Sequence, residues 1–237
     1  ISNSTLKEYD LIGIAGENEN ENQRIKVGKE VFINRNKIFF LDDESKINVY
    51  DISKKDKLVL DLKVNGHVFF DSTQESTFLG FGNKIIKYLP EGNKFELMDS
   101  LKNESISDFF KVGQKGVFFS AKNSQNEKSI YFRSNNSTGL KAVNLAKYSK
   151  LNNILWAKEI GSNIYFIHNN IFESDDNILT SYNVSTGETQ IIGFTFNNQW
   201  AKYIITSSKV VIPVRKKKNS TNDLLIVDSD KSLFLSD

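Results

Sequence analysis

Short apolar segments alternate with polar turns along the whole chain, and almost none has the length and spacing of a helix. Brief strands bounded by Gly, Asn, Asp and Ser clusters are what this pattern predicts. The clearest segments recur after about 40 to 47 residues, the interval expected of a repeated supersecondary unit. They are Ile38–Phe40, Phe78–Gly80, Val117–Phe119, Ile164–Phe166 and Val210–Ile212. The chain therefore consists of similar units in series.

These segments form the second of four columns of apolar segments, so each unit contains four strands. The third column comprises Ile47–Ile52, Lys84–Leu89, Ser129–Phe132, Leu179–Val184 and Leu224–Asp228. The tripeptide Trp156-Ala157-Lys158 returns as Trp200-Ala201-Lys202, at the same point of the next unit. Units of this size cannot bury their own apolar faces and must stack. The sequence predicts an all-β chain, a β-propeller of five to six four-stranded antiparallel blades.

Residues 1–237 are expected to form a single propeller domain, with residues 1–28 as a partial blade. Tyr9–Ala15 and Arg24–Val27 resemble a third and a fourth strand around a polar insert. Propellers commonly complete the last blade with strands from the other end of the chain, because open sheet edges invite aggregation. Five whole units and half of another leave either strands in sequence beyond these residues or one misphased column.

Two units resemble known propeller families in their third strands. Lys46–Ile52 looks like the third strand of a WD40 blade, and Asn163–Phe166 with Ser181–Glu188 is similar to WD40, kelch or quinoprotein-type blades. The pair Gly66-His67 recurs in no other unit, and the chain has no Trp-Asp pair, no kelch double Gly and no sialidase Asp-box. The resemblance implies membership of the superfold and carries over no functional residue.

Charge and composition restrict the partners more than they identify them. Of 31 basic residues 27 are Lys and four are Arg, and the formal net charge is only +2, so there is no overall field for a nucleic acid. Cys is absent, which excludes disulfides and Cys-ligated metals. No apolar stretch is long enough to cross a bilayer as a helix, and the chain starts without a signal-peptide pattern. The Lys and Asn bias favours an exported or surface protein of a bacterium, with the cytoplasm as the alternative.

The candidate binding residues are two tryptophans and one basic run. Trp156 and Trp200 could present indoles on one rim for a sugar or a protein, or could pack between blades, as equivalent positions of a repeat often do. The basic run could grip an acidic partner or an anionic surface, or could only keep a loop solvated. It consists of Arg215, Lys216, Lys217 and Lys218.

Acidic clusters and histidines offer no recognised catalytic or metal motif. Clusters at Asp42-Asp43-Glu44 and at Glu173, Asp175 and Asp176 lack the alternating carboxylates and Gly of a calcium loop. His67 and His168 have no nucleophile elbow, zinc helix or phosphate loop beside them. No catalytic residue, metal or cofactor is therefore predicted.

The function favoured by the sequence is a non-catalytic interaction module that binds a protein partner through its rim loops. The first alternative is a glycan-binding, lectin-like propeller. The second is a carbohydrate-active hydrolase, for which Asp42, Asp71, Asp175 and Asp176 are the carboxylates to inspect. The partner, the rim used and the oligomeric state are not encoded in any motif.

Overall fold

The computed structural model describes residues 30–54, 56–137, 139–145, 151–170, 173–196, 204–205, 210–214, 223–227 and 232–235. All regular elements in these residues are strands. No described helix could span a membrane. The partial blade expected in residues 1–28 lies outside the described residues.

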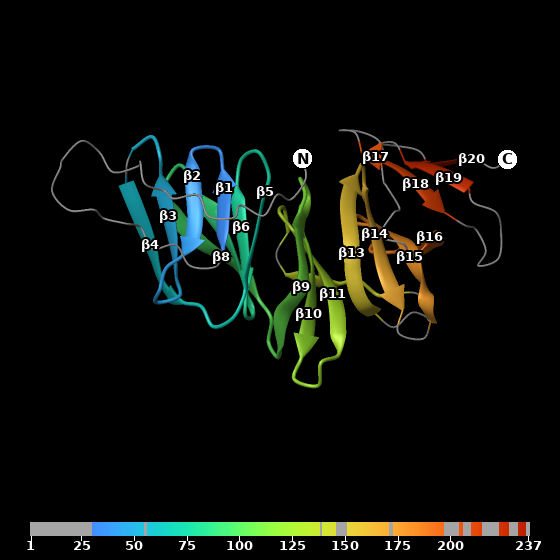
Figure 1. Ribbon diagram of the computed structural model, residues 1–237, viewed down its shortest axis with the longest axis horizontal. Coiled ribbons are helices and arrows are strands. Elements are labelled where there is room, and N and C mark those ends of the chain that lie inside the picture. Colours follow the sequence, from blue (N-terminus) through green and yellow to red (C-terminus); the bar gives the residue numbers. More distant parts are fainter. Residues whose placement is uncertain are drawn as a thin grey trace.

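Five antiparallel sheets of four strands follow one another along the chain, from blue to red in Figure 1. The first sheet contains β1 (Val31–Asn34), β2 (Lys37–Leu41), β3 (Lys46–Asp51) and β4 (Asp56–Lys63). The second contains β5 (Val68–Ser72), β6 (Thr77–Phe81), β7 (Lys84–Leu89) and β8 (Lys94–Ser100). The third contains β9 (Glu104–Val112), β10 (Gly116–Asn123), β11 (Lys128–Ser134) and β12 (Leu140–Ala142).

The fourth sheet contains β13 (Leu151–Ile160), β14 (Asn163–Asn170), β15 (Glu173–Asn183) and β16 (Thr189–Phe196). The fifth contains β17 (Ile204–Ile205), β18 (Val210–Val214), β19 (Asp223–Val227) and β20 (Ser232–Leu235). Every column of strands in the sequence thus corresponds to observed strands, and the predicted all-β propeller architecture of four-stranded blades is confirmed.

The first strands of the first four sheets lie beside one another. β1 contacts β5, β5 contacts β9, and β9 contacts β13. The order within each sheet follows the chain from this inner strand outward to the fourth strand. A stack of small sheets with the first strand innermost is the arrangement of propeller blades. We call the contact between two neighbouring sheets a junction, named by the sheets it joins.

The core lies in these junctions, in layers of aromatic and β-branched side chains. At the first–second junction Phe39 and Tyr88 meet edge to face with ring centroids 5.2 Å apart. At the third–fourth junction the rings of Phe118 and Phe166 are 5.1 Å apart. Residues of a strand alternate between its two faces, so each sheet feeds one set of apolar residues to each neighbour. This explains why the second column, which is apolar on both faces, gives the clearest sequence signal.

Polar residues at the strand ends fix the turns of the two units that resemble WD40 blades. Asp51 Oδ1 accepts hydrogen bonds from the backbone amides of Ser53 and Lys54 at 3.0 and 3.1 Å. Asn183 Oδ1 accepts from Ser185 and Thr186, both at 3.0 Å. Asp and Asn favour such turns because the short side chain reaches the backbone two residues on. These third-strand ends are therefore equivalent and structural.

Candidate functional site

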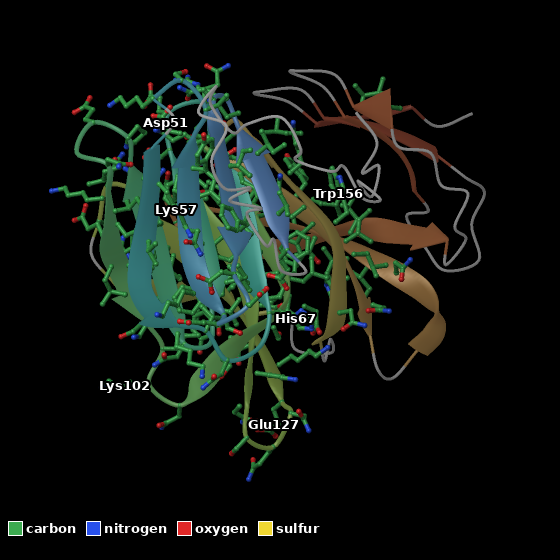
Figure 2. All side chains as sticks on the ribbon, turned by 60° about the vertical axis from the view of Figure 1, so that its left-hand side comes forward. Asp51, Lys57, His67, Lys102, Glu127 and Trp156 are labelled. Atoms are coloured by element: carbon green, nitrogen blue, oxygen red, sulfur yellow. The ribbon has the colours of Figure 1, made fainter. Side chains whose placement is uncertain are left out.

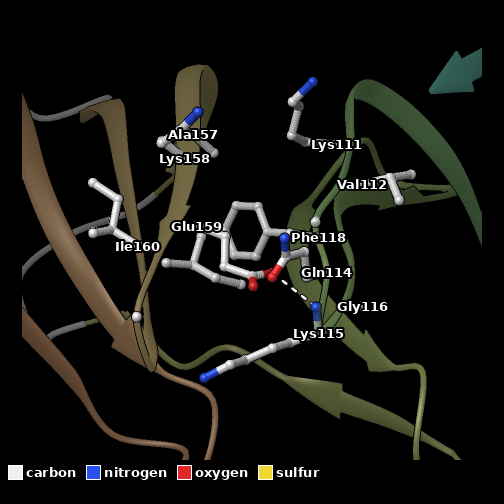
Figure 3. A pocket seen from close by; sticks show the side chains of 13 residues that line it. Lys111, Val112, Gln114, Lys115, Gly116, Phe118, Ala157, Lys158, Glu159 and Ile160 are labelled. Carbon is white, nitrogen blue, oxygen red and sulfur yellow. Dashed lines mark hydrogen bonds between the residues drawn. The ribbon is translucent and has the colours of Figure 1, made fainter. Parts of the chain in front are cut away.

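A pocket of about 480 Å³ opens at the third–fourth junction, where the first turns of the two sheets face each other (Figure 3). One wall is the end of β9 with its turn into β10, and the other is the end of β13 with its turn into β14. Apolar side chains and three lysines line it around a single carboxylate. Its lining includes Lys111, Gly113, Lys115, Phe118, Lys158 and Glu159.

Glu159 is the carboxylate of this pocket, and it crosses the junction. It lies on β13 one residue before the strand ends, and its Oε2 accepts a hydrogen bond of 3.0 Å from the backbone amide of Lys115 (Figure 3). A Cβ added at Gly113 would lie 2.1 Å from that same oxygen, so the turn admits the carboxylate only because residue 113 is glycine. Burial raises the pKa of Glu159, although the Lys115 amide and ammonium act in the opposite direction.

Two other junctions are bridged by carboxylates that accept backbone amides. At the first–second junction Glu30 Oε2 accepts from the amide of Val68 at 2.7 Å. At the second–third junction Asp71 Oδ2 accepts from the amide of Val112 at 2.8 Å and pairs with the Lys111 ammonium at the same distance. Charged acceptors strengthen such bonds roughly twofold over neutral ones. Glu159 therefore belongs to a recurring structural device, and only its pocket distinguishes it.

The lysines of the pocket differ in how they are engaged. Lys111 is bound to Asp71. The ammonium of Lys115 reaches Ser162 Oγ at 3.3 Å, away from the carboxylate. Lys158 makes no salt bridge with any described residue. Figure 3 shows the side chains of Lys111 and Lys158 on the same side of the pocket, where the charge of Lys111 is paired with Asp71 and that of Lys158 is not paired with any described residue.

The repeated tripeptide contributes to this site in part. Ala157 and Lys158 line the pocket. In the β13–β14 register Trp156 lies opposite Ile167 and Ala157 opposite Phe166, so Trp156 points to the other face of the sheet. Its side chain is half-buried and engaged with neighbours. The predicted role of Trp156 as a binding residue stays a prediction; Trp200 and the basic run Arg215, Lys216, Lys217 and Lys218 lie outside the described residues.

The acidic residues singled out for hydrolysis are engaged in structural hydrogen bonds where their side chains are described. Asp42 accepts from the amides of Glu44 and Lys46 and from the Asn48 side chain, within 3.0 Å. Its pKa is lowered because these bonds outweigh the opposing effect of burial. Asp71 is bound at both oxygens, Oδ1 accepting from Ser72 and Oδ2 as above. The side chains of Asp175 and Asp176 are not described. Within the described residues no three His, Asp or Glu side chains gather as a metal site.

The two histidines are in opposite environments. His67 is 88% exposed, with Nδ1 3.0 Å from Glu30 Oε1 (Figure 2). His168 is fully buried on β14, and its Nε2 lies 3.1 Å from Thr180 Oγ1. Its Nδ1 has no hydrogen-bond partner among the described residues, and burial lowers the pKa of His168 to about 4. The imidazole is therefore neutral inside the sheet stack and does not reach the pocket lining.

Sequence reasoning missed Glu159, Lys111 and Lys115. The available signal was the position of a charged residue near the end of the first strand of a unit. In the second, third and fourth sheets this residue lies one position before the last pair between the first two strands. The pairs are Asp71–Phe78, Lys111–Phe118 and Glu159–Ile164. A charged residue recurring at that point of an otherwise apolar unit indicates a common role. The spacing of Gly113 and Lys115 in the sequence did not indicate that their turn meets Glu159.

No protein-family model matches the chain, and no curated protein matches it. Solved structures do. The computationally designed Ika8 protein is 12% identical with a TM-score of 0.53, over 87% of this chain and 59% of that one. An oligogalacturonate lyase from Vibrio parahaemolyticus is 11% identical with a TM-score of 0.50, over 89% of this chain and 67% of the lyase.

The extracellular domain of a hybrid two-component system protein from B. thetaiotaomicron is 14% identical with a TM-score of 0.50. This chain is covered over 92% and spans 28% of that protein. The lyase is a β-propeller fold, so the likeness agrees with the sheets described above. At these identities the similarity shows the fold alone.

Proposed function

We propose that the chain is a non-catalytic β-propeller that binds a protein partner on the face formed by its first turns, with the pocket between β9 and β13 receiving a partner side chain. The observation that supports this most is the pocket itself: apolar walls, lysines at its edge and one carboxylate held by the backbone. Pockets of this kind serve as anchor sites for single side chains in protein interfaces.

The residues that line the pocket favour a binding role over hydrolysis. Its lining contains one carboxylate, Glu159, and no histidine. A glycosidase of the usual kind needs two carboxyl groups roughly 5 to 10 Å apart. One oxygen of Glu159 is already committed to the amide of Lys115. The most direct role for this group is to shape the pocket and hold the junction.

Site-specific photocrosslinking in cells of the source organism tests the proposal. A benzoylphenylalanine replaces exposed Gln114 at the pocket edge, and in a matched variant it replaces Glu127 at the tip of the β10–β11 hairpin, which extends beyond the neighbouring sheets (Figure 2). We expect one discrete polypeptide crosslinked from position 114 and none from position 127. Crosslinks equal at both positions, or none from a folded Gln114 variant, contradict the proposal; turnover of an oligosaccharide that is lost in Glu159→Gln would establish the hydrolase instead.

A further inference from the structure

The charges around the pocket are unbalanced toward the positive. Lys111 from β9, Lys115 from the following turn and Lys158 from β13 surround the single carboxylate of Glu159. The residues contributed by β10 and β14, Phe118 and Ile164, carry no charge. Asp71 compensates Lys111 from the second sheet. Lys115 and Lys158 therefore leave an excess of one positive charge beside Glu159.

One carboxylate oxygen of Glu159 accepts no hydrogen bond from the described residues. Its Oε2 is bound to the amide of Lys115, whereas its Oε1 accepts no hydrogen bond from any described residue. The side chain is half-buried against Gly113 and the ring of Phe118 lies in the same pocket. A carboxyl group in such a place is predisposed to take a proton, since burial disfavours its charged form and raises the pKa of Glu159.

We propose that the pocket between β9 and β13 accepts an acidic side chain of the partner, and that Glu159 takes up one proton from water as this group enters. The lysines attract the incoming carboxylate. Two carboxylates within hydrogen-bond distance cannot both stay ionised, so one proton is shared between them. The protonated Oε1 of Glu159 then donates to the ligand, while Oε2 keeps the Lys115 amide. This inference rests on the proposed function for the source of the acidic group.

A basic occupant is disfavoured by the same geometry. It could pair with Glu159 Oε1, but it would enter between Lys115 and Lys158, and like charges at close range are strongly unfavourable in an interface. The two occupants make opposite predictions for one substitution. Glu159→Gln has the shape of the protonated acid and supplies a donor, so it strengthens binding of an acid and weakens binding of a base.

The test titrates the full chain with blocked pentaglutamate, pentaglutamine and pentalysine peptides, followed by calorimetry and by amide NMR shifts at Gly113–Gly116. For wild type we expect pentaglutamate alone to bind, about tenfold tighter at pH 5.5 than at pH 7.5, with close to one proton taken up when buffers of different ionisation enthalpy are compared. Glu159→Gln should bind at pH 7.5 as tightly as wild type at pH 5.5, with no proton uptake. Lys158→Gln should weaken binding about fivefold at both pH values, and Glu127→Gln should match wild type.

Each contrary result is decisive. Weaker pentaglutamate binding by a folded Glu159→Gln variant, preferential binding of pentalysine, or proton uptake unchanged in Glu159→Gln overturns the inference. The photocrosslink separates this failure from that of the proposed function. A crosslink at position 114 without the acidic preference leaves a protein partner of other chemistry, and the acidic preference without any crosslink means that the pocket takes a free acid.

Discussion

The second–third and third–fourth junctions use the same device and differ in what it leaves open. At the second–third junction Asp71 bonds the end of β9 and Gly80 lies against the ring of Phe110. At the third–fourth junction Glu159 reaches back to the turn after β9, where it accepts from the amide of Lys115, three residues beyond the strand end. The pocket lies beside this bridge, and both Glu159 and Lys115 line it. The two bridges thus differ in which backbone amide the carboxylate reaches, and the candidate site lies beside the bridge made by Glu159.

The two bridges differ in direction and in the length of the hairpin connection that follows each carboxylate. The connection between β5 and β6 has four residues, Thr73–Ser76, and that between β13 and β14 has two, Gly161–Ser162. Asp71 and Glu159 occupy the same pair position before their turns. Asp71 bonds to the following sheet, whereas Glu159 bonds to the preceding one.

The largest expected effect comes from removing the facing aromatic of each junction. Phe78 and Phe118 are both almost fully buried, opposite Asp71 and Lys111. We expect Phe78→Ala to lower the free energy of unfolding by about 4 kcal/mol and Phe118→Ala by about 3 kcal/mol, because the second cavity opens into an existing pocket and fills with water. Urea unfolding followed by fluorescence measures both. If the two variants lose the same unfolding free energy, the open pocket does not reduce the cost of the cavity left by Phe118→Ala.

Gly80 and Gly113 provide the next comparison. A Cβ at residue 80 would lie 2.5 Å from the packed ring of Phe110, and one at residue 113 would meet the carboxylate of Glu159. A ring in the core cannot withdraw, whereas a carboxylate at an open pocket can. We expect Gly80→Ala to cost about 2 to 3 kcal/mol and Gly113→Ala about 1 kcal/mol in unfolding free energy. If Gly113→Ala costs as much as Gly80→Ala, the Glu159 bridge is as rigid as the aromatic core.

The sequence predicted the sheets far better than the site, for a physical reason. The position of a strand follows from local alternation of apolar and polar residues, so Lys84–Leu89 is predicted with the ends that the structure shows. The site depends on two turns about 45 residues apart in sequence, as the repeat interval implies. Neither Glu159 nor Gly113 is unusual in its own unit, and their meeting depends on how two sheets pack. The tripeptide at 156–158 lies on the same strand as Glu159 but did not single out that carboxylate, because a repeated Trp marks a packing position as readily as a binding one.

His168 adds a pH dependence to the third–fourth junction. Its pKa is lowered to about 4 in the folded protein, so the unfolded chain binds a proton that the folded protein does not between pH 6.5 and about 4. Stability is therefore full above pH 6.5 and falls with decreasing pH, by about 2 kcal/mol at pH 5. We expect His168→Gln to flatten the change in urea midpoint between pH 7.5 and pH 5. His67→Gln, which removes a surface histidine, is the matched control, and an unchanged slope in His168→Gln refutes the assignment.

The smallest expected difference tests the bridging carboxylates themselves. Both oxygens of Asp71 accept hydrogen bonds, whereas an asparagine side chain has only one oxygen. Asp71→Asn therefore places its NH₂ group against a backbone N–H donor, and it also removes the ion pair with Lys111. Glu159 uses only Oε2, and Glu159→Gln retains that acceptor for the Lys115 amide. We expect Asp71→Asn to lower the unfolding free energy by about 1.5 kcal/mol and Glu159→Gln by less than about 0.5 kcal/mol, measured at pH 7.5. A loss in Glu159→Gln as large as in Asp71→Asn would show that the charge of Glu159, and not its acceptor, holds the third and fourth sheets together, and a protonated Glu159 would then be incompatible with an intact junction.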